Sequence, residues 1–313
     1  MKKISKNEQL FNAVEDWNIE EAKKLLKAGA KANLKYKKSW QYGGYTGYEG
    51  KSILEMCYNN TEQMFLDMYT LLLENGADPK HDTSIFAATH YGYLKVVKLL
   101  VKYGADIHQL NSKRFNENIL QFIDFSKENS LEMLKYFLNK GVDAKAIDDR
   151  GKNCLFNISE DNHLQHAQLL IDAGADVNQK EKFTNCNVLH NIVTISHNNF
   201  TKILQFLIDA GADTNAWDSD EKSPLIAASK YGNIDAINVL LNNGVDVNQQ
   251  YKDKETRGKT ALMIALEWRN IKIAELLRDK GANPNLVSGK TAFYYTQHNK
   301  DLENIINKTN KIL

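Results

Sequence analysis

The chain has 313 residues, of which 25% are charged, and its formal net charge at pH 7 is +1. This balance provides no bulk field to draw the protein to nucleic acid or an anionic membrane. No run of 18 apolar residues occurs and the N-terminal residues lack the apolar core of a secretory signal, so we expect no membrane insertion. The three cysteines lie far apart in sequence, which fits a reducing compartment and predicts a cytoplasmic location.

A short phrase recurs eight times, from LLKAGAKAN at Leu25–Asn33 to LRDKGANPN at Leu277–Asn285. Apolar residues with helical spacing precede each phrase, as at Ile234, Ile237 and Leu240. A glycine then stands where a left-handed residue can end a helix. These glycines are Gly29, Gly76, Gly104, Gly141, Gly174, Gly211, Gly244 and Gly281.

A second, shorter helix is expected before each of these segments. In SPLIAASKYG, Ser223 can cap the helix and Pro224 suits its first position. The repeating unit is therefore predicted to be a turn, a short helix, a loop and a longer helix. In chain order we expect about nine such helix-turn-helix units in one domain, 1–313, with an insertion at 34–48; the units are 5–33, 48–80, 81–109, 115–145, 150–178, 184–215, 220–248, 257–285 and 288–313.

The short helices share a second motif, which reads SPLI at Ser223, NVLH at Asn187, TALM at Thr260 and TSIF at Thr83. It degenerates to NCLF, NILQ and SILE, which begin at Asn153, Asn118 and Ser52. Together with the GAD-x-N phrase, these motifs resemble the ankyrin repeat, T-P-L-H-x-A with a period of 33. The resemblance covers essentially the whole chain. It implies an all-α solenoid with projecting β-turn or hairpin loops and polar capping repeats at both ends, which would make the chain complete without a catalytic domain.

Three places depart from the regular spacing. Units two, four and six contain two or three extra residues, which are expected to lengthen a loop or a helix end. The Gly76–Ile85 interval is five residues short, which predicts a truncated turn that kinks the solenoid or leaves a gap in the row of turn tips. The insertion places aromatic residues around Gly43-Gly44, a hairpin signal. Its residues are expected either to contact a partner or to form a self-packed or mobile loop.

No catalytic or metal-binding constellation emerges from the sequence. The GKS and GKT sequences at Gly50, Gly258 and Gly289 lack the first glycine of a phosphate loop, and a turn glycine followed by a helix cap explains them. A zinc site needs about four converging ligands, whereas the nearest candidates are dispersed along two units: Cys154, His163, His166, Cys186 and His190. We therefore expect no metal, no cofactor and no enzymatic activity.

Nucleic-acid binding is also not expected, because the chain has no basic stripe. One cluster of lysines, Lys31, Lys35, Lys37 and Lys38, is better explained as a solvated loop.

The ankyrin resemblance implies that a partner protein binds to a concave surface built from the turns and the ends of the short helices. Carried over to this sequence, that surface contains many of the residue types that anchor interfaces. The candidate residues are Trp40, Tyr42, Tyr45, His90, Tyr91, Arg114, Phe115, Asp149, Arg150, Trp217, Lys230, Tyr231, Tyr251, Glu267 and Trp268. Trp217, Tyr231, Tyr251 and Trp268 are expected near one another, and the alternative is that these rings fill space between repeats.

We predict a protein-protein interaction module, monomeric when free, that acts by occupying its partner. A stoichiometric inhibitor or immunity protein directed against a toxin or enzyme is the first form of this hypothesis. A scaffold effector delivered into a host cell is the second. Recognition of a small molecule or nucleotide by the concave aromatics is the alternative of a different class, with Lys230 beside Trp217 and Trp268 as its candidate site.

Overall fold

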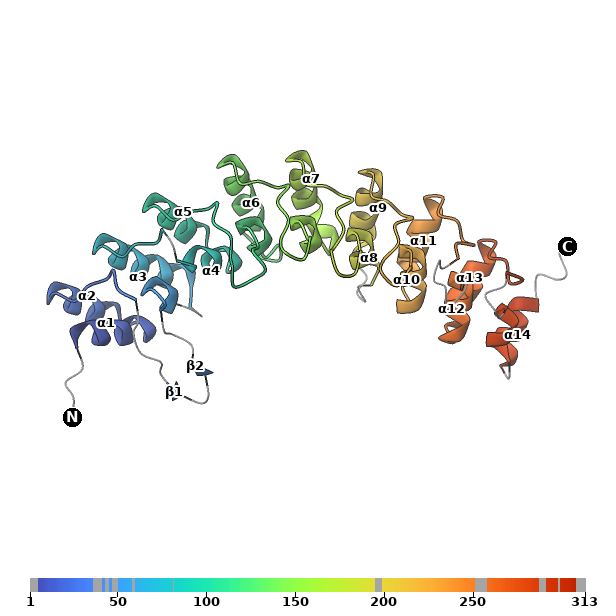
Figure 1. The fold of residues 1–313 in the computed structure, drawn as a ribbon, viewed down its shortest axis with the longest axis horizontal. Helices are drawn as coiled ribbons and strands as arrows, with labels where there is room; N and C mark the ends of the chain where they lie inside the picture. Colours follow the sequence, from blue (N-terminus) through green and yellow to red (C-terminus); the bar gives the residue numbers. More distant parts are fainter. Residues whose placement is uncertain are drawn as a thin grey trace. The chain divides into compact units, whose positions relative to one another are not determined.

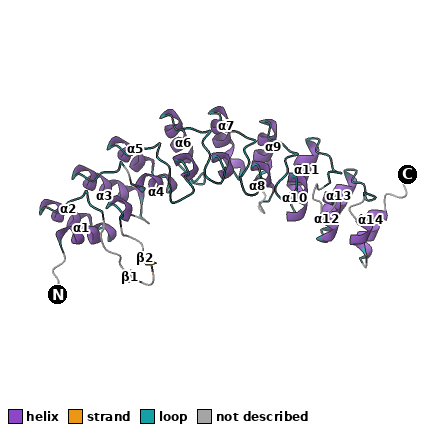
Figure 2. Cartoon of the chain, viewed as in Figure 1, coloured by secondary structure: helices purple, strands orange, loops and turns teal. Residues whose placement is uncertain are grey.

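The structure is a computed structural model that describes residues 5–35, 41–42, 45–46, 50–57, 60–80, 82–194, 199–250, 258–286, 291–297 and 299–307. It divides into two compact bodies, which we call the N-terminal body (Met1–Asp143) and the C-terminal body (Ala144–Leu313). The single domain predicted from the sequence stays a prediction. The regular elements of the described residues are helices, apart from the two-residue strands β1 (Gln41–Tyr42) and β2 (Tyr45–Thr46) (Figures 1 and 2).

The N-terminal body contains the first four helix pairs. They are α1 (Lys6–Glu15) with α2 (Ile19–Lys27), the 3-10 helix η1 (Leu54–Met56) with α3 (Glu62–Glu74), α4 (Ser84–His90) with α5 (Leu94–Lys102), and η2 (Ile119–Phe122) with α6 (Ser130–Asn139). In the first three pairs the second helix of each pair packs against the second helix of the next: α2 contacts α3, and α3 contacts α5. The extra residues of the second unit lie in α3, which has 13 residues where α2 has 9, so the predicted lengthening of a helix is confirmed there.

The C-terminal body contains the remaining pairs. They are η3 (Cys154–Asn157) with η4 (Asp161–His163) and α7 (Leu164–Asp172), α8 (Val188–Val193) with α9 (Thr201–Asp209), α10 (Pro224–Tyr231) with α11 (Ile234–Asn242), α12 (Ala261–Glu267) with α13 (Ile271–Asp279), and η5 (Ala292–Thr296) with α14 (Lys300–Asn307). The first helices α8, α10 and α12 form one layer, and α7, α9 and α11 form part of the other (Figure 1). The predicted repeating unit is thereby confirmed.

The tail glycines end the second helices as predicted. Gly29 has a φ of 90°, which a residue with a side chain adopts only at a cost. Its N–H donates to the Leu26 carbonyl over 2.9 Å, and the next N–H, of Ala30, donates to Leu25 over 3.0 Å. This pair of bonds is a Schellman motif, which satisfies carbonyls left free at the helix end. All eight tail glycines have positive φ values between 80° and 99°.

The polar residues of the same phrase join neighbouring repeats. The Asp176 side chain accepts the Asn178 N–H over 2.8 Å, which folds the tail back on itself. Asn178 then accepts the Asp213 N–H over 2.7 Å and donates to the Gly211 carbonyl over 2.9 Å, so one amide bridges two repeats. Asn248 makes the equivalent pair of bonds, to Asn283 and Gly281 of the repeat that follows it.

Four first helices of the described residues, η1, η2, η3 and η5, are 3-10 helices and not the expected short α-helix. The 3-10 helices η1, η2 and η3 follow the three degenerate motifs, and each ends at a buried apolar residue in extended conformation: Cys57, Ile123 and Ile158. Because an extended residue cannot continue a helix, its burial limits the first helix to one short turn. The motifs TSIF, NVLH, SPLI and TALM all begin α-helices.

The truncated turn between the second and third units is replaced by a cluster of carboxylates and hydroxyls. Asp82 is 5% exposed and accepts hydrogen bonds from the Ser84 N–H over 3.0 Å and the Ser52 hydroxyl over 2.9 Å. Glu55 accepts the Ser52 N–H over 2.8 Å and the Thr83 N–H over 3.2 Å. Side chains of these two units therefore satisfy backbone groups that a full turn would otherwise cover.

The pKa values of the two carboxyl groups of this cluster are shifted in opposite directions. Burial raises the pKa of Asp82 from 3.8 to about 6, and its hydrogen bonds to Ser84 and Ser52 offset this only in part. Burial also raises the pKa of Glu55, but the hydrogen bonds from Thr83 and Ser52 outweigh it and hold that pKa below its ordinary value.

A substitution at Gly211 tests the glycine cap. A Cβ at this position would meet no atom within 4 Å, so Gly211→Ala should cost only the strain of a left-handed alanine, about 1 kcal/mol of unfolding free energy. Gly211→Asn should cost less, because asparagine tolerates this conformation. Urea unfolding followed by circular dichroism measures both. Equal losses in the two variants would contradict the capping argument.

A substitution at Asp82 tests the buried carboxyl. Between pH 4 and pH 6 the folded chain retains the Asp82 proton and the unfolded chain has lost it, so this group lowers the unfolding free energy as the pH rises, by up to about 3 kcal/mol. Asp82→Asn keeps the shape and remains neutral, so we expect it to remove this contribution and to be more stable than the parent at pH 7. Unfolding titrations of both proteins at pH 4 and pH 7 measure the difference; parallel pH profiles would refute the assignment.

Candidate binding surface

Two turns of the C-terminal body are built in the same way around an aspartate. Asp148 accepts the N–H groups of Arg150 and Lys152, both over 2.9 Å. Asp218 accepts the N–H groups of Asp220 and Lys222, over 2.9 and 2.8 Å. A short carboxylate that binds the backbone two and four residues ahead fixes a tight turn without regular structure.

Adjacent turn tips are joined by backbone hydrogen bonds. The Lys182 N–H donates to the Arg150 carbonyl over 2.7 Å, and the Ser219 N–H donates to the Thr184 carbonyl over 2.7 Å. Three successive tips are therefore connected in a row, which holds their outward side chains in a fixed order.

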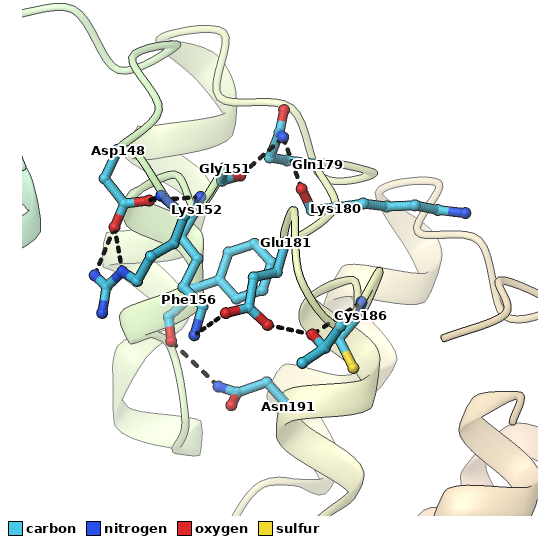
Figure 3. A network of polar contacts seen from close by, with 11 residues as sticks. Asp148, Gly151, Lys152, Phe156, Gln179, Lys180, Glu181, Cys186 and Asn191 are labelled. Atoms are coloured by element: carbon cyan, nitrogen blue, oxygen red, sulfur yellow. Dashed lines mark hydrogen bonds and ion pairs between the residues drawn. The ribbon is translucent and has the colours of Figure 1, made fainter. Parts of the chain in front are cut away.

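Side chains reinforce the connection between the first two of these tips (Figure 3). Gln179 donates to the Gly151 carbonyl over 2.8 Å, and Lys152 forms an ion pair with Glu181 at 3.4 Å. Both partners of this ion pair are mostly buried, so it helps to fix the tips and leaves little charge for a ligand.

Of the two candidates at the first tip, Asp149 is exposed and Arg150 is half-buried. The Arg150 guanidinium is held by Asp148, whose carboxylate lies 2.5 Å from Nη2 and 2.7 Å from Nε. Arg150 thus has a structural partner already, and Asp149 is the side chain that this tip presents to solvent.

In the N-terminal body, candidate Tyr91 belongs to a packed aromatic cluster. Its ring centroid lies 5.5 Å from Tyr93 and 5.9 Å from Phe65, and Phe65 also contacts Trp17 at 4.7 Å and Tyr69 at 5.5 Å. Tyr91 therefore fills space between repeats, which was the alternative interpretation of these rings, and is not an exposed anchor. Phe65 is fully buried at the centre of this cluster, a role that sequence reasoning missed although Phe65 and Tyr69 are four residues apart on α3. The adjacent candidate, His90, is exposed.

Candidates Arg114 and Phe115 lie at the tip of a short hairpin. The hairpin is closed by the Asn111 N–H, which donates to the Glu117 carbonyl over 2.9 Å. Phe115 is 54% exposed and has a φ of 53°. A bulky residue in this region is strained. The Arg114 guanidinium lies 5.0 Å from the ring centroid of Phe122 and 3.5 Å from the Glu117 carboxylate, so it packs against its own repeat.

The C-terminal ends of α10 and α12 bring two exposed rings to one edge of the C-terminal body. Tyr231, the last residue of α10, is 60% exposed, and Trp268, directly after α12, is 61% exposed. The two helices are in contact, and a Cβ built on Gly232 would lie 3.4 Å from the Asn270 side chain. The loops that follow the two rings therefore touch.

The charged candidates at these ends have different surroundings. The Lys230 ammonium lies 5.9 Å from the Tyr231 ring centroid. Glu267 receives both of its carboxylate hydrogen bonds from Lys259, each over 2.9 Å. Burial lowers the pKa of Lys259, but the bonds to Glu267 outweigh this effect and raise it above its ordinary value. The negative charge of Glu267 is thus paired with a lysine of its own repeat.

The remaining candidates lie elsewhere or outside the described residues. Trp217 is half-buried in the turn before α10, whereas Tyr231 is the last residue of that helix. The two residues are therefore at opposite ends of α10, which is about 12 Å long. Tyr42 and Tyr45 are paired in the register of the antiparallel strands β1 and β2, which confirms the predicted hairpin. Trp40 and Tyr251 lie outside the described residues.

The histidines considered as metal ligands have structural surroundings. His190 is buried, and its Nε2 lies 3.0 Å from the Lys222 carbonyl of the next repeat, to which it donates. His163 accepts the Ser159 N–H over 3.3 Å. Burial and the neighbouring His163 lower the pKa of His166 to about 4. Within the described ranges, no group of three or more His, Cys, Asp or Glu side chains is arranged to hold a metal ion.

No helix among the described residues combines the length and apolar character needed to cross a bilayer.

Comparison with protein families places this geometry in a known class. A model for ankyrin repeats (3 copies) matches residues 189–288, and the ankyrin repeat model matches residues 80–112. The human ASB11 ankyrin repeat domain superposes with a TM-score of 0.58 over 72% of this chain and 96% of that domain, at 19% identity, which shows a shared fold.

Three curated proteins show more limited similarity. A fowlpox virus protein named for its ankyrin repeats is 32% identical over 52% of this chain and 48% of its own length. A mimivirus ankyrin repeat protein is 39% identical over 21% of this chain and 38% of its own length. An L-asparaginase from Dirofilaria immitis is 27% identical over 49% of this chain and 25% of its own length. This chain therefore spans less than half the length of each of these relatives.

The stacked helix pairs and hydrogen-bonded turns define a helical-repeat protein. The glycine-capped tails, the turn hairpins and the family matches identify the type of repeat. The chain is an ankyrin-repeat protein.

Two substitutions test which aromatic rings stabilise the fold and which are only exposed on its surface. Phe65→Ala should lower the unfolding free energy by about 3–5 kcal/mol, because it removes the centre of a buried cluster. Tyr231→Ala should change it by less than about 0.5 kcal/mol, because that ring is mostly in solvent. Urea unfolding of the two variants and the parent provides the comparison. A large loss for Tyr231→Ala would mean that this ring is also structural.

Proposed function

We propose that this ankyrin-repeat protein binds another protein through the edge of the C-terminal body where α10 and α12 end. The observation that carries the proposal is the exposure of Tyr231 and Trp268 at the ends of two helices whose following loops touch. Tyrosine and tryptophan are the residues that most often anchor protein interfaces, and rings exposed to this extent contribute little to the fold itself.

Hydrogen bonds hold the loops that carry these rings. The N–H of Asn270 donates to the Ala265 carbonyl over 2.8 Å, and its side chain accepts the Ile273 N–H over 3.3 Å. Asn233 caps α11 in the same way and also donates to the Val193 carbonyl of the preceding repeat over 3.0 Å. A preordered surface loses little conformational entropy on binding, which supports an interface made without rearrangement.

The proposed mode of action is steric, since a row of fixed side chains can cover a complementary surface of the partner. Inhibition of a toxin or enzyme, as by an immunity protein, is the form of this action that the sequence predicted first, and it stays a prediction. The same holds for delivery into a host cell, a cytoplasmic location, a monomeric state and the absence of enzymatic activity. Recognition of a small molecule at Lys230 also stays a prediction.

Combined replacement of the two rings tests the proposal. Affinity capture with the parent chain identifies candidate partners, and calorimetry with the purified partner measures binding. Tyr231→Ala combined with Trp268→Ala should weaken binding by about 100-fold or more, because two central anchors are lost.

Phe183→Ala is the matched control. Phe183 is 67% exposed on a turn tip of the same body, so its removal deletes a ring of similar exposure at a different place. A partner that binds the double variant as tightly as the parent, or that depends only on Phe183, would exclude the proposed edge. Unchanged circular dichroism of all variants shows that the fold is retained.

A further inference from the structure

We infer that the partner presents an acidic segment, with an apolar side chain within it, to the edge marked by Tyr231 and Trp268. This inference rests on the proposed function and specifies the chemistry of the partner. Its basis is the charge that surrounds the two rings after the internal ion pairs have been taken into account.

Three cations lie next to the rings along the chain. Lys230 precedes Tyr231, Arg269 follows Trp268, and Lys272 lies in the first turn of α13. The ion pairs found among the described residues include none of the three. Arg269 and Lys272 are exposed and Lys230 is half-buried, so all three ammonium or guanidinium groups can reach a bound carboxylate.

The anions of this edge do not cancel that charge. Glu267 is paired with Lys259, as described above. Asp235 is exposed in the first turn of α11, where a negative charge is favoured by the helix dipole. The edge therefore retains a net positive charge beside its two rings.

The loop between α12 and α13 is itself locally unfavourable in two ways. Lys272 places a positive charge at the positive end of the helix dipole of α13, the position that Asp235 fills with a negative charge in the preceding repeat. Arg269 has a φ of 54°, where the matching residue of the preceding repeat, Gly232, has 79°. Strain and unfavourable charge retained in one exposed loop are commonly associated with binding, and a bound carboxylate would relieve the electrostatic part.

The rings and a neighbouring aliphatic side chain account for the apolar part of the partner. Ile271 is 36% exposed and lies three residues after Trp268. An apolar side chain bound against these groups would exclude water from the surrounding carboxylate–cation contacts and strengthen them.

Single-stranded nucleic acid also combines negative charge with flat apolar faces. It is disfavoured here because three cations at one edge can pair with only a short run of phosphates along a continuous nucleic-acid backbone. The nearly neutral chain likewise provides no long-range attraction for it.

A peptide selection against the full chain tests the inference. Random 12-residue peptides displayed on phage are selected on the parent protein, after removal of those that bind the Tyr231→Ala, Trp268→Ala double variant. The retained peptides should be enriched in Asp and Glu around an apolar residue. Fluorescence anisotropy then measures their affinity for the parent and for the triple variant Lys230→Gln, Arg269→Gln, Lys272→Gln, which should bind about tenfold or more weakly, with a smaller dependence on salt.

Lys182→Gln combined with Lys280→Gln is the matched control, because both lysines are exposed on the same body, Lys182 at a turn tip and Lys280 at the opposite end of α13 from Lys272. It should bind the peptides as the parent does. Ring-dependent peptides without acidic enrichment would overturn the inference and leave the proposed function intact. Recovery of no ring-dependent peptide would count against both. Tighter binding of a labelled oligo-dT strand than of any peptide, lost in the triple variant, would assign the edge to nucleic acid and overturn the inference.

Discussion

The hydrogen bonds of the GAD-x-N phrase are the interaction on which the rest of the structure depends. The left-handed glycine ends the second helix, and the asparagine two residues after the aspartate bridges to the next repeat, as Asn178 does to Gly211 and Asp213. One phrase therefore fixes both where a helix stops and where the next repeat begins. Since these bonds use mainly backbone groups and two short side chains, the turn tips and first-helix ends are left free to differ between repeats.

That freedom is used differently in the two bodies. Tyr91 and Tyr231 occupy equivalent positions, each next to the left-handed glycine that follows a first helix. Tyr91 is packed because Phe65 and Tyr93 surround it, whereas Tyr231 is mostly in solvent and has Lys230 above its ring. The position supplies a ring in either case, and the neighbouring repeat determines whether that ring stabilises the fold or is displayed.

Sequence periodicity could predict the helix pairs, the glycine caps and the hairpin because these depend on residues close together in the chain. It could also have anticipated the 3-10 helices η1, η2 and η3, since these coincide with the degenerate motifs SILE, NILQ and NCLF, but not η5, which has no such motif. The roles of individual candidates could not be deduced in this way. Arg150 is held by Asp148, and Glu267 by Lys259, through distances that depend on how each turn or helix end folds. The ring environments of Tyr91 and Tyr231 likewise depend on contacts between repeats.

The carboxylate cluster at the shortened turn has a consequence for how this chain can evolve. Ser52 and Glu55 come from one repeat, Asp82 and Thr83 from the linker to the next, and each satisfies groups on the other side. Loss of either partner would leave a buried carboxyl or backbone N–H unsatisfied. These two repeats therefore have to be inherited together. The bridge from the tail asparagine, as from Asn248 to Gly281 and Asn283, needs only the common phrase in both repeats. Unequal crossing-over can therefore duplicate or delete a repeat at such a bridge, and change the length of the array, while the bridge itself is kept.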